Sequence, residues 1–165
     1  MRVSNGIGDD NDVVRWIFLP LVVVLGLPAA CNRASAPGSS ATSHATVVFG
    51  DGSRLAVRVA DTPGERETGL MDVMVLPEND GMAFVYDAPS TDTYWMKDTL
   101  VPLSIAFVGS DGTVVAIRDM PPCTAEPCPT YAAGRPFTMA VEANVGWFGE
   151  HGVGVGDRAR LEGST

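Results

Sequence analysis

Short apolar runs separated by tight turns constrain the fold of this 165-residue chain more than any other feature. Two such runs, residues 46–49 and 54–59, flank Gly50-Asp51-Gly52-Ser53, a segment of turn-forming residues. In the second run, apolar residues alternate with two arginines. This pattern predicts a β-hairpin with one face buried and one face in water.

The same pattern recurs later in the chain. Residues 104–108 and 113–117 flank Ser110-Asp111-Gly112, and here both faces of the runs are apolar. Because a strand that is buried on both faces lies inside a sheet, we expect this second hairpin at the centre of the sheet.

Four further runs are typical of strands, namely residues 82–86, 91–96, 137–142 and 158–161. Helices are few. One is predicted to begin at Thr62, where a capping box is present, and another to run from Asn144 to about Glu150. About eight short strands with two short helices predict a mainly β (α+β) fold, a compact closed sheet or small barrel.

An apolar run near the N-terminus is typical of an export signal. Residues 16–27 are almost uncharged, a length that suits a signal peptide and is too short for a comfortable membrane-spanning helix. Small residues and a tract of Ser, Pro and Gly follow. We therefore interpret residues 1–30 as a signal peptide rather than a buried core strand.

Two cleavage sites compete. Pro28-Ala29-Ala30-Cys31 resembles a lipoprotein signal, in which Cys31 would be lipidated and anchor the protein on the outer face of the cell membrane or in the periplasm. Cleavage after Ala36 would instead discard Cys31 and release a soluble secreted protein. Residues 31–45 are small and polar and predict a flexible tether, and residues 46–163 have the length of one domain.

The three cysteines favour the lipoprotein form. An odd thiol in an exported chain needs an explanation, which acylation of Cys31 supplies if Cys123 and Cys128 form a disulfide. A redox pair usually has a tighter Cys-x-x-Cys spacing, and zinc needs four ligands, for which only His44 and His151 could join the pair. We expect a structural disulfide, no metal and no cofactor.

The acidic charge of the chain excludes one class of partner. The formal net charge is −9 at pH 7, and removal of residues 1–30 leaves −8, because three Asp and two Arg are lost. Proteins that bind nucleic acid neutralise phosphates with clustered Lys and Arg. We therefore expect no nucleic-acid partner.

Several unusual short motifs follow one another between residues 46 and 161. They are Val59-Ala60-Asp61-Thr62-Pro63, Glu65-Arg66, Gly69-Leu70-Met71, Leu76-Pro77, Gly81-Met82-Ala83-Phe84-Val85, the segment 94–103, Met120-Pro121-Pro122-Cys123 and the segment 142–147. In order and spacing they resemble the family catalogued as domain of unknown function 192. The resemblance implies a compact, mainly β domain, often exported, with no established reaction. The family usually has Asn where this chain has Asp98, so this position lacks the amide donor.

The segment 94–99 is the first candidate binding site. It places two large aromatic residues and a Met beside a cation, a carboxylate and a hydroxyl. Trp95 could form an apolar wall and Lys97 an anion anchor, with Asp98 and Thr99 as polar contacts. The alternative is a structural role, in which Asp98 makes an Asx turn with Thr99.

Strand alternation in this segment makes a specific prediction. If Tyr94 and Met96 are buried, then Trp95 lies on the opposite face, beside Lys97. An exposed aromatic residue next to a cation is common at recognition surfaces.

Glu142 and Asn144 form the second candidate site. A carboxylate on a strand just before a helix could face a pocket beside backbone N–H groups. The alternative is that Asn144 caps the helix while Glu142 accepts a hydrogen bond from the helix N-terminus or from Arg118. Trp147 and Phe148 are expected in the core.

Three functional classes follow from these residues. We favour a non-catalytic module that binds a small molecule, a peptide or an envelope component. Nucleophilic catalysis has little support, because no serine lies in a Gly-x-Ser-x-Gly motif, but a hydrolase or lyase that uses Asp98 and Glu142 as acid and base is an alternative. The third class is a structural or protein-docking lipoprotein.

Overall fold

The computed structural model describes residues 43–50 and 52–163, so the expected signal peptide and Cys31 lie outside the described residues. Within these ranges the chain forms nine strands and two short helices: β1 (His44–Phe49), β2 (Arg54–Ala60), α1 (Pro63–Thr68), β3 (Asp80–Ser90), β4 (Thr93–Trp95), β5 (Leu103–Val108), β6 (Val114–Met120), β7 (Thr130–Ala132), β8 (Phe137–Asn144), α2 (Trp147–Glu150) and β9 (Ala159–Glu162). β1 thus begins at His44, two residues before the domain boundary expected from the sequence.

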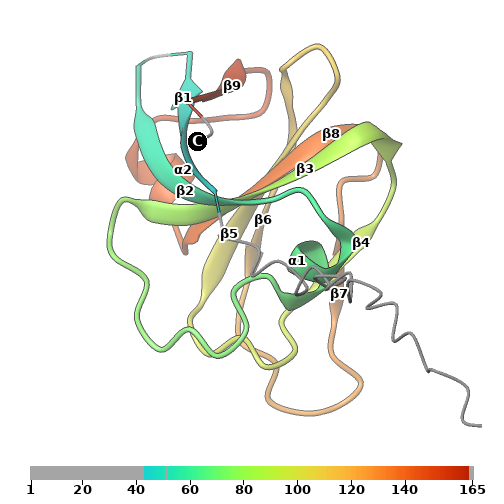
Figure 1. The fold of residues 1–165 in the computed structure, drawn as a ribbon. Helices are drawn as coiled ribbons and strands as arrows, with labels where there is room; N and C mark the ends of the chain where they lie inside the picture. Colours follow the sequence, from blue (N-terminus) through green and yellow to red (C-terminus); the bar gives the residue numbers. More distant parts are fainter. Residues whose placement is uncertain (1–42, 51, 164–165) are drawn as a thin grey trace, which may run out of the picture. The chain divides into compact units, whose positions relative to one another are not determined.

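Seven of the described strands form one sheet, in the order β6-β5-β8-β3-β2-β1-β9 (Figure 1). Neighbouring strands are antiparallel except β2 and β3, which are parallel and are connected through α1. β4 and β7 form a separate antiparallel ribbon. α1 begins as the sequence predicts, because Thr62 and Glu65 form a capping box.

The large sheet is curled, so that its two edge strands approach each other at one end. The backbone N–H of Val114, in β6, donates to the carbonyl of Asp157 at 2.8 Å, and the N–H of Ala159, in β9, donates to the carbonyl of Gly112 at 2.8 Å. The fold is therefore mainly β, with a half-barrel sheet, a second small sheet and two short helices among the described residues. The predicted fold class is confirmed.

Some details differ from the sequence predictions. All eight predicted strands overlap observed strands, but β7 was not predicted. The second hairpin is not central: β5 lies inside the sheet with every residue buried, whereas β6 is an edge strand. β6 is nevertheless apolar on both faces, because one face packs in one hydrophobic core and the other face packs in the second. At one end its free edge also lies next to the start of β9.

The curled sheet separates two hydrophobic cores, because alternate residues of each strand point to opposite faces. The inner core contains side chains from all seven strands and from α2, including Phe49, Trp147 and Phe148. The expectation that Trp147 and Phe148 are core residues is confirmed. The outer core lies between the other face of the sheet and the β4–β7 ribbon, and includes Tyr94 and Phe137.

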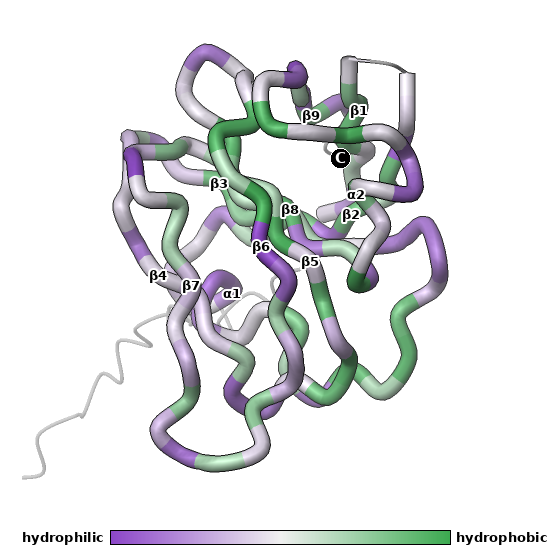
Figure 2. The backbone as a smooth tube through the Cα atoms, turned by 180° about the vertical axis from the view of Figure 1, so that it is seen from behind, coloured by the Kyte–Doolittle hydropathy of each residue, from purple (hydrophilic) through white to green (hydrophobic). Residues whose placement is uncertain are grey.

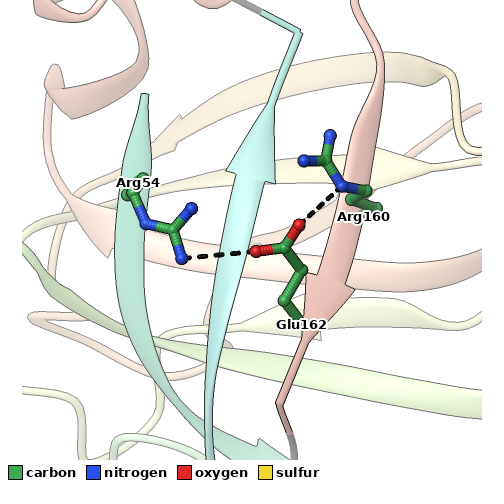
Figure 3. A network of polar contacts seen from close by, with 3 residues as sticks. All are labelled: Arg54, Arg160 and Glu162. Atoms are coloured by element: carbon green, nitrogen blue, oxygen red, sulfur yellow. Dashed lines mark hydrogen bonds and ion pairs between the residues drawn. The ribbon is translucent and has the colours of Figure 1, made fainter. Parts of the chain in front are cut away.

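Hydropathy and charge follow this arrangement. Hydrophobic residues are concentrated in the central strands, and the loop between α1 and β3 also carries hydrophobic residues (Figure 2). On the surface, Glu162 of β9 accepts hydrogen bonds from Arg54 of β2 at 3.3 Å and from Arg160 at 2.8 Å, so this ion-pair network passes over β1 (Figure 3). Exposed ion pairs contribute little to stability, so the cores hold the fold together.

Candidate functional site

The strand alternation predicted at residues 94–96 is confirmed. Tyr94 and Met96 are buried, with 8% and 1% of their surface exposed, whereas Trp95 is 47% exposed. Tyr94 is held from two directions: its ring packs edge-on against Phe84, with centroids 5.1 Å apart, and its hydroxyl lies 3.0 Å from that of Tyr86. Burial raises the pKa of Tyr94 far above its ordinary value, so the phenol stays protonated.

Lys97 and Asp98 follow Trp95 and turn the chain away from the ribbon. The Lys97 ammonium lies 5.5 Å from the centre of the Trp95 ring, a cation–π distance. Asp98 has φ of 52°, in the left-handed region that Asn and Asp adopt more readily than most residues. This backbone conformation gives a physical reason for Asn or Asp at this position that needs no side-chain donor.

Glu142 lies in β8, the strand between β3 and β5, opposite Met82 on one side and Ile105 on the other. On β8 it alternates with Val141 and Ala143 of the inner core, so its side chain points to the face of the outer core. The neighbouring strand approaches closely here: any side chain at Gly81 would collide with the carbonyl oxygen of Glu142. Glu142 is therefore fixed at the centre of the sheet.

The Glu142 residue is almost entirely buried, and its carboxyl group keeps only a small contact with solvent and has no polar partner within the described residues. Only 4% of the residue is exposed, and no hydrogen bond or ion pair to the side chain is found in that part of the chain. Burial raises the pKa of Glu142 to about 8, because the charged form loses its hydration. At neutral pH the side chain is therefore mostly a neutral carboxylic acid.

The predicted structural roles of Glu142 and Asn144 are wrong. Glu142 does not pair with Arg118, which is exposed and donates to the carbonyl of Ile117. Asn144 does not cap α2, whose N-cap is Gly146. Instead the Asn144 amide donates to the carbonyls of three successive residues, Leu76 at 3.2 Å, Pro77 at 2.9 Å and Glu78 at 3.4 Å. Asn144 thus fixes the loop that precedes β3.

A small cavity lies over the Glu142 side chain. Its volume is about 30 Å³, and Tyr94, Trp95, Thr99 and Glu142 line it together with the segment 66–71 and Phe84. Thr99 is buried, and its hydroxyl donates to the carbonyl of Lys97 at 3.2 Å, so its lone pairs can accept a hydrogen bond. The cavity therefore combines a carboxyl, a hydroxyl and aromatic walls.

Arg66 also lines this cavity but is engaged elsewhere. Its guanidinium donates to the carbonyls of Asp61 at 2.5 Å and Val85 at 2.9 Å, and lies 4.7 Å from the centre of the Tyr86 ring. The side chain therefore holds α1 against the middle of β3 and makes no hydrogen bond or ion pair with Glu142.

The six candidate residues lie in three places. Trp95, Thr99 and Glu142 share the cavity, whereas Lys97 and Asp98 line a separate groove beside the disulfide loop. Asn144 lies in neither of these two hollows. The wall formed by segment 66–71 and Phe84 was not predicted, although Arg66, residues 69–71 and Phe84 belong to motifs that resemble the family, a signal that could have indicated it.

Cys123 and Cys128 are bonded to each other, with Cα atoms 5.5 Å apart, which confirms the predicted pairing. Disulfides are typical of proteins outside the cytoplasm. Among the described residues, no group of three or more His, Cys, Asp or Glu side chains is arranged to hold a metal ion. In the same part of the chain, no helix has the length and apolar character needed to span a membrane.

The fold and the site together define the class of this protein: a small, mainly β domain in which a half-barrel sheet separates two hydrophobic cores and carries the Glu142 carboxyl on the face of the outer core. The chain belongs to the DUF192 family, described as "Uncharacterized ACR", whose model matches residues 46–161. The predicted membership is therefore confirmed. None of the curated proteins compared with the chain matches it.

Among the solved structures that are similar to this chain are the following two. One, from Sinorhizobium meliloti 1021, is described provisionally as a transcription regulator; it is 29% identical, with a TM-score of 0.65 over 76% of this chain and 98% of that one. The other is a protein of unknown function from Novosphingobium aromaticivorans DSM 12444, 30% identical, with a TM-score of 0.62 over 82% of this chain and 99% of that one.

Proposed function

We propose that this protein is an exported, lipid-anchored binding module, whose ligand inserts a small polar group into the cavity over Glu142. The observation that carries the proposal is the Glu142 carboxyl, which has no partner within the described residues and is exposed only through an accessible cavity. A buried polar group without a hydrogen bond lowers the stability of the fold, and a ligand that supplies the missing bond recovers that loss.

The alternatives have less support. An acid–base pair requires both carboxylates at one substrate, but Asp98 lines a different groove from Glu142. A role in transcription, as the description of the Sinorhizobium structure suggests for that protein, fits poorly with a net charge of −9, since DNA-binding surfaces are rich in Lys and Arg.

Native mass spectrometry of the full chain, extracted from its own membranes, tests the binding function. We expect a bound molecule that is lost in the Glu142→Gln variant and retained in Glu150→Gln, which removes an exposed carboxylate on α2. A ligand retained equally by both variants would place binding elsewhere. The unliganded mass in every preparation would argue against a binding module.

Lipid anchoring is tested separately at Cys31. Cys31→Ser should move the protein from the membrane fraction to the soluble fraction, since Cys31 is the cysteine outside the disulfide. A mature N-terminus at Pro37 would show cleavage after Ala36 and a soluble secreted form.

A further inference from the structure

The chemistry of the cavity selects the kind of group that it can bind. The Glu142 carboxyl shares its cavity with aromatic and apolar side chains and with a few polar ones, and none of the described residues donates a hydrogen bond to it. A ligand that donates hydrogen bonds and carries a positive charge would satisfy the oxygens of the carboxylate. Its charge would also compensate for the hydration that the carboxylate loses on burial. An anion or an apolar group would do neither.

The size of the cavity limits this group further. A water molecule needs roughly 10 to 15 Å³ of such space, so a cavity of about 30 Å³ holds a group no larger than one or two waters. A primary ammonium has this size and offers three N–H donors. A quaternary ammonium is too bulky to enter.

The remaining walls suit a small cation. Phe84, Tyr94 and Trp95 line the cavity, and aromatic rings attract cations. The Thr99 hydroxyl provides a second acceptor. Two other charged side chains line the cavity, Arg66 and Glu67, and their opposite charges offset each other, so Glu142 decides the local charge.

We propose that the cavity binds a primary ammonium group of a larger ligand, such as a lysine side chain or a peptide N-terminus, with Glu142 and Thr99 as acceptors and Trp95 at the rim. This inference rests on the binding function proposed above and specifies its ligand. The bulk of the ligand lies outside the cavity, against Trp95 and the segment that includes Met71.

Ammonium binding at this site should depend on pH in a characteristic direction. The empty site holds a proton at neutral pH, because burial raises the pKa of Glu142 to about 8, and a bound ammonium must displace that proton. The affinity for an ammonium therefore rises with pH up to about 8 and levels off above it. A neutral ligand that accepts a bond from the protonated carboxyl would show the opposite slope.

The test is an NMR titration of the full chain with n-butylammonium, monitored at the Trp95 indole N–H and the Thr99 amide. We expect saturable shifts, with binding about 25-fold tighter at pH 8.5 than at pH 6.5 because the ionised fraction of Glu142 rises by that factor, and no saturation with tetramethylammonium or n-butanol. Glu142→Gln should weaken binding by at least about tenfold, and Glu150→Gln should not change it. If Glu142→Gln does not fold, the pH dependence of the unsubstituted protein decides.

The outcomes separate the inference from the proposed function. If n-butanol or n-butyrate shifts these signals and n-butylammonium does not, the cavity binds ligands but the ammonium inference is wrong. If no probe shifts them, both the site and the inference are wrong. If n-butylammonium does bind, two lysine peptides distinguish the possible sources of the ammonium group. One is acetylated at the N-terminus and offers only the lysine side chain, and the other is acetylated at the side chain and offers only the N-terminus.

Discussion

The two cores of this domain treat polar groups differently. In the inner core, Phe49, Trp147 and Phe148 pack ring against ring, and the one polar atom of these rings, the Trp147 indole nitrogen, donates to the Asn79 side chain at 3.0 Å. In the outer core, Tyr94 also finds a partner, but Glu142 has none within the described chain. The ring nitrogen in the inner core is therefore paired, whereas the Glu142 carboxyl on the side of the outer core loses hydration without a hydrogen bond in return, which lowers the stability of the fold.

Glu142 lies where a cavity connects the outer core to solvent. The rings of the inner core are buried, whereas the cavity beside Tyr94 reaches the surface at the half-exposed Trp95. A buried carboxyl at such a place is a candidate for function rather than packing. The predictions below test this difference between the two cores, from the largest expected effect to the smallest.

Truncation in the inner core should have the largest effect on stability. Trp147→Ala removes a fully buried ring that contacts Phe49, Phe148 and His151, so we expect a loss of about 3 to 5 kcal/mol in the free energy of unfolding. Urea denaturation measures it. A loss below about 1 kcal/mol would show that the inner core does not dominate stability.

Glu142→Gln should make the pH dependence of stability weaker. The folded pKa of about 8 lies above the ordinary 4.5, so the stability that the protonated carboxyl contributes is complete below pH 4.5 and is lost as the pH rises to about 8. Between pH 5 and pH 9 we expect the unsubstituted protein to lose roughly 4 kcal/mol relative to the variant.

Urea denaturation at both pH values measures this difference, with Glu150→Gln as the matched control because that carboxylate is exposed. Parallel pH profiles for the unsubstituted protein and Glu142→Gln would mean that the outer core holds no costly carboxyl. The comparison between the two cores would then fail.

Removal of the disulfide should have a smaller effect than either change. The bridge closes a short loop between β6 and β7, outside both strands, and a closed loop of this length stabilises by roughly 2 kcal/mol. We expect the double variant Cys123→Ser/Cys128→Ser to stay folded, with a two-state transition at lower urea. Loss of the transition would show that the bridge is essential for the outer core.

Trp95→Ala should have the smallest effect on stability and a large effect on binding. Because Trp95 is 47% exposed, its truncation should cost about 1 kcal/mol or less. The saturable n-butylammonium shift of the Thr99 amide should nevertheless be lost or weakened. A drop in melting temperature above about 10 °C would assign Trp95 to packing instead.

The sequence was sufficient for the elements that depend on local patterns. Alternation predicted the strands and the opposite sides of Tyr94 and Trp95, and the capping box predicted the start of α1. β7 was missed because three residues, Thr130–Ala132, are too few to show a period, and they pair only with the equally short β4.

The candidate site depended on long-range contacts that local patterns do not show. Glu142 was correctly placed on a strand, but its neighbours come from β3 and β5 and from segment 66–71, which are distant in sequence. Asn is a residue type that often caps the N-terminus of a helix, yet the carbonyl groups that Asn144 binds lie 66 to 68 residues away in the sequence. Sequence alone could therefore name these residues but not their partners.

The central claim is that the outer core contains a carboxyl without a partner. NMR titration of the Glu142 side-chain carboxyl carbon, assigned by comparison with Glu142→Gln, tests it most directly. We expect a midpoint near pH 8, because burial without a partner disfavours the charged form. A midpoint at or below 4.5, the ordinary value, would show that Glu142 is hydrated or paired in solution, and would contradict the account.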